Sequence, residues 1–221
     1  MKFARMKNSY SFLGNYVPLL TNNEQRIKNM LLDYKLQTKM EKLPNGQEVP
    51  NLFFNKDNIQ IRFLAFRIDF DYNYINAECT MQKSLKSACD FFKLLGEIFD
   101  AKGARIALVS SLFTDNKNQA AAKYLSEKFG MNQLFGPCNE FTFRINNIKQ
   151  SFEPLNSVLD FRPGQAKNQK TGEVHDMMIA NIDVNTLITN KDHRFDPVNA
   201  EEYFSDLLME EQEKINILYE L

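Results

Sequence analysis

The sequence is poor in the residue types that build disulfide-stapled or metal-bound folds. Among its 221 residues there are three cysteines, Cys79, Cys89 and Cys138, and only two histidines. An odd number of cysteines without a CxxC pair argues against a disulfide framework and against a zinc knuckle. We therefore expect all three thiols to be core residues of a protein that resides in a reducing cytoplasm.

Glycine is also scarce, and the glycine-rich phosphate-binding motifs are missing. The eight glycines form neither GxGxxG nor GxxxxGK[ST], which argues against a nucleotide-binding loop. His175 and His193 each have an aspartate beside them, but the sequence contains no Gly-x-Ser-x-Gly motif for a nucleophile. These absences argue against a Ser-His-Asp hydrolase, and we expect no cofactor.

The sequence has almost no net charge and no long apolar run. A formal net charge of -1 gives no overall attraction to nucleic acid or to an anionic membrane. The apolar stretch Tyr10–Leu20 is interrupted by Gly14, Asn15 and Pro18, so we expect neither a secretion signal nor a membrane span. We do not expect a membrane partner.

Local basic clusters leave nucleic acid as a less favoured partner. They are Lys35, Lys39 and Lys42 on an expected early strand, and Arg162, Lys167 and Lys170 on an expected hairpin loop. Nucleic-acid surfaces usually add exposed aromatic residues to such clusters. Because these are absent here and edge strands are often protected by lysine, a solvated sheet edge is the favoured interpretation.

The longest alternation of apolar and polar residues runs from Ile59 to Ile75 and predicts the organising strand of the fold. Apolar residues occupy the odd positions up to Phe63 and the even positions from Ile68 onward. One continuous pleat cannot bury both sets on the same side. The reversal predicts one strand, or two joined end to end, with a bulge or tight bend near residues 64–66.

Other segments predict a largely antiparallel α+β fold with helices packed mainly on one face. We expect one domain over residues 1–221, in which residues 1–20 could form a short strand or an N-terminal arm. Capping residues and apolar spacing predict helices near residues 21–33, 80–99, 116–129 and 196–218. Strands are expected near residues 34–41, 49–54, 59–75, 105–113, 140–148, 152–161 and 174–187. Phe92 and Leu95, central in the second apolar stripe, should be buried against the organising strand.

Two aspartates on the organising strand suggest a metal site. Asp69 and Asp71 lie two residues apart and therefore share a face, with Glu78 and Lys83 downstream. Three carboxylates could hold Mg²⁺ while the lysine orients a water molecule, as a Mg²⁺-dependent nuclease requires. This nuclease is our alternative function.

The simpler interpretation pairs the same aspartates with arginines. Arg62 and Arg67 lie on the same stretch, and an exposed strand face commonly carries such ion pairs. The spacing Gly-Asp/Glu-x-Lys does not follow on a neighbouring strand. We therefore favour ion pairs and a protein that is not an enzyme.

The C-terminal helix has more apolar residues than one buried side requires. Its stripe consists of Phe204, Leu207, Leu208, Ile215 and Leu218. Tyr203, Met209, Ile217 and Tyr219 lie outside that stripe and are our candidate interaction residues. They predict a protein partner or a homo-oligomer, unless they pack under the N-terminal arm instead.

A resemblance supports a binding role. Residues 52–73, with Phe53-Phe54-Asn55-Lys56-Asp57 and Arg67-Ile-Asp-Phe70, and Ile182-Asp183-Val184 before the last helix, resemble uncharacterised bacterial proteins with a SecB-like antiparallel sheet. The SecB chaperone has no counterpart of the N-terminal segment or the two middle helices. The resemblance implies a non-enzymatic oligomeric binding protein, chaperone-like or an accessory subunit of a toxin-antitoxin or phage-defence system. It implies no catalytic residue.

Overall fold

The computed structural model describes residues 3–115, 121–136, 142–167 and 172–220. Its strands are β1 (Ala4–Leu13), β2 (Lys35–Lys42), β3 (Glu48–Lys56), β4 (Ile59–Leu64), β5 (Arg67–Asn73), β6 (Arg105–Asp115), β7 (Phe143–Gln150), β8 (Pro154–Lys167) and β9 (Val174–Thr186). Its helices are α1 (Val17–Met30), α2 (Met81–Ile98), α3 (Ala121–Lys128), α4 (Met131–Phe135) and α5 (Ala200–Glu220), the last preceded by a 3₁₀ turn at Pro197–Asn199.

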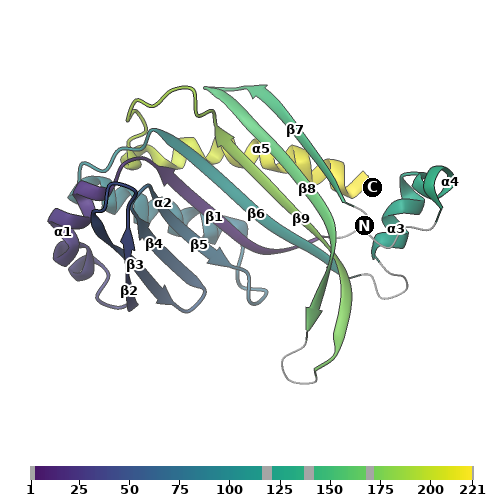
Figure 1. Ribbon diagram of the computed structural model, residues 1–221, viewed down its shortest axis with the longest axis horizontal. Coiled ribbons are helices and arrows are strands. Elements are labelled where there is room, and N and C mark those ends of the chain that lie inside the picture. The colour runs from purple at the N-terminus through teal and green to yellow at the C-terminus, as the bar shows by residue number, and fades with distance from the viewer. Residues whose placement is uncertain (1–2, 116–120, 137–141, 168–171, 221) are drawn as a thin grey trace.

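The nine strands form one sheet in the order β2-β3-β4-β5-β1-β6-β9-β8-β7, and every pairing is antiparallel. Helices α1, α2 and α5 lie on one face of this sheet (Figure 1). The predicted α+β class with a largely antiparallel sheet is therefore confirmed. We call the opposite side of the sheet the helix-free face.

The N-terminal segment is the centre of the sheet. The sequence allowed residues 1–20 to be an arm, but Ala4–Leu13 forms β1, which pairs with β5 on one side and β6 on the other. Helix α1 begins at Val17, four residues before the expected cap at Thr21. The strand alternative is therefore right and the arm is wrong. The sequence left both open because β1 carries residues that are buried on both faces, which gives no one-sided pattern.

The organising stretch is a hairpin. β4 and β5 pair with Leu64 opposite Arg67 and Ile61 opposite Phe70, around a tight turn at Ala65 and Phe66. This pairing places odd positions of β4 beside even positions of β5, so the apolar residues of both strands share one face. The predicted bend was at the right place, and the expectation of strands joined end to end was wrong.

An aromatic core fills the space between the sheet and α2 and α5. Phe92 and Leu95 are buried, as predicted, but Phe92 contacts aromatic rings of β1 and α5, where contact with the organising strand was expected. The Phe92 ring lies 4.7 Å from Phe12 of β1 and 5.5 Å from Phe204 of α5, measured between ring centroids. Its neighbour Phe91 is the residue that contacts β4 and β5. Phe92 therefore joins both long helices to the central strand.

The second half of the chain follows the predicted pattern with shifted bounds. β8 and β9 pair as far as Lys167 opposite Val174, so residues 163–167, the first half of the loop expected at residues 163–172, are strand. Residues 168–171, with Lys170, lie outside the described part of the chain, as do Asn116 and Cys138. Gly130 has φ +68° at the end of α3, which is the left-handed exit that its position predicts. The short helix α4 was not predicted.

Candidate functional site

The helix-free face holds a buried acidic pair at its centre. Asp69 and Asp71 of β5 are both buried and lie on the same face, as their spacing predicts. Two hydroxyl groups of β1 point at them from the neighbouring strand. Ser11 Oγ donates to Asp69 Oδ1 at 2.7 Å, and Ser9 Oγ donates to Asp71 Oδ1 at 2.5 Å.

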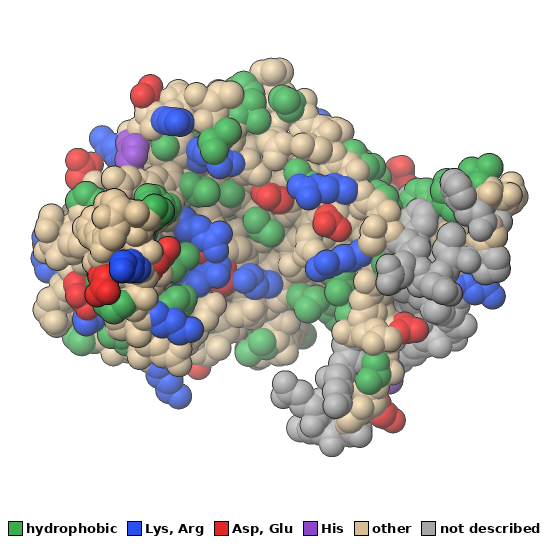
Figure 2. Space-filling view, in the orientation of Figure 1, with side chains coloured by type: hydrophobic (Ala, Val, Ile, Leu, Met, Phe, Trp, Pro, Cys, Tyr) green, Lys and Arg blue, Asp and Glu red, His purple; other side chains and the backbone are tan. Residues whose placement is uncertain are grey.

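Three cations cover these carboxylates. Arg62 Nη2 lies 3.0 Å from Asp69 Oδ2 and 3.1 Å from Asp71 Oδ2, so one guanidinium bridges both acids. Arg67 Nε lies 3.0 Å from Asp69 Oδ2, and Lys7 Nζ lies 2.8 Å from Asp71 Oδ2. Figure 2 shows lysine and arginine side chains gathered near the middle of the molecule. Three positive charges against two negative ones give this cluster a formal charge of +1, so the carboxylates are fully compensated.

Burial dominates the titration of Asp69. Desolvation raises the pKa of Asp69 above its ordinary value, and the attraction of Arg62 only partly opposes this shift. A carboxylate that is desolvated and already paired with arginine is a structural group, because a metal ion or a substrate would have to displace those partners.

The structure does not bring the four residues of the nuclease alternative together. Glu78 is exposed in the loop before α2, and Lys83 is exposed in the first turn of α2, where its backbone N–H donates to the Thr80 cap. Helix α2 lies across the sheet from Asp69 and Asp71. Among the described residues, no group of three or more His, Cys, Asp or Glu side chains is placed to hold a metal ion.

A second buried ion pair lies between the sheet and α5. The register of β1 against β6 shifts between Arg5 and Lys7, and this bulge turns Arg5 toward the helix side. There Arg5 makes a bidentate pair with Glu211 of α5, which is fully buried. Desolvation lowers the pKa of Arg5, but the hydrogen bonds to Glu211 outweigh it and raise that pKa. The sequence alone does not reveal this pair, because Glu211 resembles a solvated helix residue.

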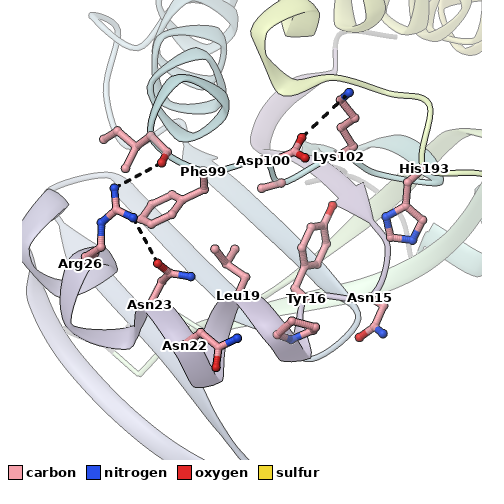
Figure 3. Close-up of a pocket in the computed structure, with 13 residues that line it drawn as sticks. Asn15, Tyr16, Leu19, Asn22, Asn23, Arg26, Phe99, Asp100, Lys102 and His193 are labelled. Atoms are coloured by element: carbon pink, nitrogen blue, oxygen red, sulfur yellow. Dashed lines mark hydrogen bonds and ion pairs between the residues drawn. The ribbon is translucent and has the colours of Figure 1, made fainter.

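A pocket of about 420 Å³ opens between α1 and the segment after α2 (Figure 3). Two of its three basic side chains are engaged within the protein. Arg26 stacks on the Phe99 ring at 5.1 Å and donates to Asn23, while Lys102 Nζ lies 4.0 Å from Asp100 Oδ1. Because Arg26 and Lys102 are already paired within the protein, the pocket offers few free charged groups to a ligand.

The remaining polar groups of this pocket are few. His193 lies at the rim, near Gly14, where its Cε1 atom would be 3.3 Å from an added Cβ. The Tyr16 hydroxyl is buried and finds no hydrogen-bond partner among the described residues, and burial raises its pKa above the ordinary value. Because this hydroxyl is inaccessible to water, a ligand in the pocket cannot contact it either.

The four candidate interaction residues of α5 have different surroundings. Tyr203 is half-buried and stacks with Phe152 at a centroid distance of 6.2 Å, so it packs within the protein. Met209 is 63% exposed and Ile217 is 43% exposed. Tyr219 is exposed too, although its ring lies 6.4 Å from Phe3 near the N-terminus.

The exposed side of α5 lies beside the edge strand β7. Lys149 of β7 forms ion pairs with Glu210 and Glu213 of α5, at 3.1 Å for Glu210. Met209 lines a hollow of about 230 Å³ together with Lys149. We call Ile145, Met209, Ile217 and Tyr219 the α5–β7 surface; all four side chains are exposed, as is Ile148 on the other face of β7.

The two described thiols, Cys79 and Cys89, differ in burial. Cys89 is buried, and desolvation raises its pKa to about 12, whereas Cys79 is only half-buried. Both are free. Cys89 is the core thiol that the sequence predicts, and Cys79 is not.

Comparison with known proteins gave no match: no family model, no curated protein and no solved structure resembles this chain closely enough to be reported. No described helix combines the length and the apolar character that a membrane crossing needs.

Proposed function

We propose that this protein is a cytoplasmic protein-interaction module, an accessory subunit rather than an enzyme, and that it binds its partner through the α5–β7 surface. The observation that carries this proposal is the placement of exposed apolar residues of α5 beside an edge strand. Edge strands and exposed apolar patches are the two features by which folded proteins recruit other chains.

The register of α5 against β7 makes these residues one surface. Lys149 pairs with Glu210 and Glu213, and the two elements run in opposite directions. Four residues of a strand cover about 13 Å, which a helix covers in about nine residues. The same register therefore places Ile145 level with the last turns of α5, near Ile217.

The partner that fits this surface is an extended segment with alternating apolar side chains. It would add to β7 as a tenth strand, and one row of its side chains would contact Ile145 and Ile217. Ile148 points to the helix-free face and would contact the other row. A chaperone-like protein or an accessory subunit of a toxin-antitoxin or phage-defence system is what the SecB-like resemblance implies, and binding of an extended segment would suit either role.

Site-specific photo-crosslinking tests this proposal. A photoreactive amino acid at Ile217 should give an adduct with a partner chain in cells that express the protein. Leu94 on α2 is the matched control, because it is an apolar helix residue that is 40% exposed. Ile217→Glu should abolish the complex and Leu94→Glu should not. Equal adducts from both positions would overturn the proposal.

The nuclease alternative has a separate test. Asp71→Ala should retain the partner complex, because Asp71 lies on the helix-free face and away from α5. A variant that folds and keeps its partner but loses a Mg²⁺-dependent cleavage shown by the wild type would mean that interaction is not the whole function.

A further inference from the structure

The other edge of the sheet, β2, presents a bare strand. In the described part of the chain β2 pairs only with β3, and Lys35–Met40 are exposed throughout. The backbone groups on its outer side therefore face solvent. The strand is long enough to take part in a further ladder, since it runs for eight residues.

The two faces of β2 differ in chemistry. Leu36, Thr38 and Met40 stand opposite apolar residues of β3, on the helix side of the sheet. Leu36 is 38% exposed and Met40 is 60% exposed. Lys35, Gln37, Lys39 and Glu41 point to the helix-free face. Leu36 and Met40 therefore extend the apolar side of the sheet beyond β3, whose residues on that side are the last to be buried.

The sequence of β2 is complementary to itself in one antiparallel register. A two-fold axis perpendicular to the sheet keeps side chains of one face together, so a second copy can be centred on any single residue of β2. Centring on Thr38 places Leu36 opposite Met40 and Lys35 opposite Glu41, each twice. Apolar residues then meet apolar residues, and both charge pairs are of opposite sign.

The neighbouring registers lack this match. Centring on Gln37 places Lys35 opposite Lys39, twice. Centring on Lys39 places that lysine opposite itself and Leu36 opposite Lys42. Like charges directly opposite one another destabilise a strand pair, so only the Thr38 register of the three is favourable on both faces.

Contacts within the chain prepare the charged face. Glu41 Oε2 accepts a hydrogen bond from Asn51 Nδ2 at 2.8 Å, which fixes the carboxylate on the outer strand. Lys39 Nζ lies 5.6 Å from the Phe53 ring centroid and so leans back over its own sheet. Lys39 therefore does not oppose a second copy, where it would stand across from Gln37.

We propose that the protein forms a homodimer through β2, in the register that places Thr38 opposite Thr38, so that two nine-stranded sheets join into one. The helices of both copies then lie on the same side of the joined sheet. This inference is independent of the proposed function, because β2 and the α5–β7 surface are at opposite ends of the strand order.

Charge reversal tests both the interface and its register. Lys35→Glu places two pairs of glutamates across the interface, and Glu41→Lys places two pairs of lysines there. Each variant should dimerise about tenfold or more weakly than the wild type in sedimentation equilibrium. Mixing the two variants in equal amounts should restore the dimer, because every pair in the mixed dimer is again of opposite sign. Lys93→Glu, at an exposed position of α2, is the control and should leave dimerisation unchanged.

The outcomes are distinct. A wild type that stays monomeric at high micromolar concentration would overturn the proposal, as would two variants that show no recovery on mixing. If a dimer re-forms only when a different pair of charge-reversal variants is mixed, the Thr38 register is wrong. Crosslinking from Ile217 should be unchanged by Lys35→Glu, so failure of the dimer leaves the proposed function standing.

Discussion

The middle of the sheet and its edges both carry charged and apolar residues, but these residues are buried and paired in the middle and exposed at the edges. In β1 and β5 both faces are filled, with aromatic rings packed on the helix side and carboxylates paired with cations on the helix-free face. In β2 and β7 nearly every side chain is exposed. The charged residues that look most like a catalytic site therefore stabilise the sheet, while the residues free to bind lie at the edges.

This contrast follows from the number of neighbours. A central strand has a partner on each side, so its polar groups are desolvated and must be paired. An edge strand leaves one row of backbone groups and its flanking side chains in solvent. Substitutions in the middle should therefore change stability, and substitutions at the edges should change association.

The largest expected effect is on the apolar side of the middle. Phe92→Ala removes the ring that joins Phe12 to Phe204 and should lower the free energy of unfolding by about 3–5 kcal/mol. Leu94→Ala, two residues further along α2 and exposed, is the control. Chemical denaturation measures both, and a melting curve unchanged by Phe92→Ala would mean that this face is not the core.

On the helix-free face, Asp71→Ala leaves Lys7 and Arg62 without one of their acceptors. The cost should be about 3 kcal/mol, at the lower end for a broken buried pair because both cations can turn toward solvent. Asp90→Ala removes an exposed ion pair with Lys86 and should cost much less, because solvent screens that pair. If Asp71→Ala and Asp90→Ala lower the free energy of unfolding by the same amount, the ion pairs of Asp71 are not buried.

The pH dependence of Asp69 gives a smaller effect of defined sign. Because desolvation raises its pKa, the folded state binds this proton more tightly than the unfolded state does. The contribution of Asp69 to stability is therefore fully present below the ordinary pKa and decreases as the pH rises through the raised value. Asp69→Asn has no such titration, so the stability of the wild type relative to Asp69→Asn should fall from pH 3 to pH 7. A rise over that range would contradict the direction of the shift.

At the edges, stability should hardly change. Met40→Lys on β2 and Ile148→Lys on β7 replace exposed side chains and should each alter the free energy of unfolding by less than about 0.5 kcal/mol. Met40→Lys should weaken self-association and Ile148→Lys should weaken partner binding. Urea denaturation of the two variants, paired with sedimentation and partner-binding assays, would separate these roles. A loss of several kcal/mol from either variant would show that its edge is part of the core.

The sequence predicts what depends on local patterns. The stripe around Phe92 and the shared face of Asp69 and Asp71 both follow from spacing within one element. These features need no knowledge of which strands are neighbours. The expected fold class follows from the same patterns.

The rest depends on contacts between distant segments. β1 is central only because β5 and β6 pair with it, and its sequence carries no sign of either partner. The pair between Arg5 and Glu211 joins residues 206 positions apart through a bulge that alternation alone does not reveal. The cations over Asp69 and Asp71 include Lys7, which only the pairing of β1 with β5 brings there.

Hydrogen exchange of the backbone amides, measured at two protein concentrations, tests most directly whether the middle of the sheet is structural and its edges bind. The account predicts that amides of β1 and β5 exchange slowest at both concentrations, and that β2 and β7 exchange fastest in the dilute protein. At high concentration the outward amides of β2 should become protected while those of β7 stay fast until a partner is added. Exchange in β2 that does not depend on concentration, or protection of β7 in its place, would contradict the account.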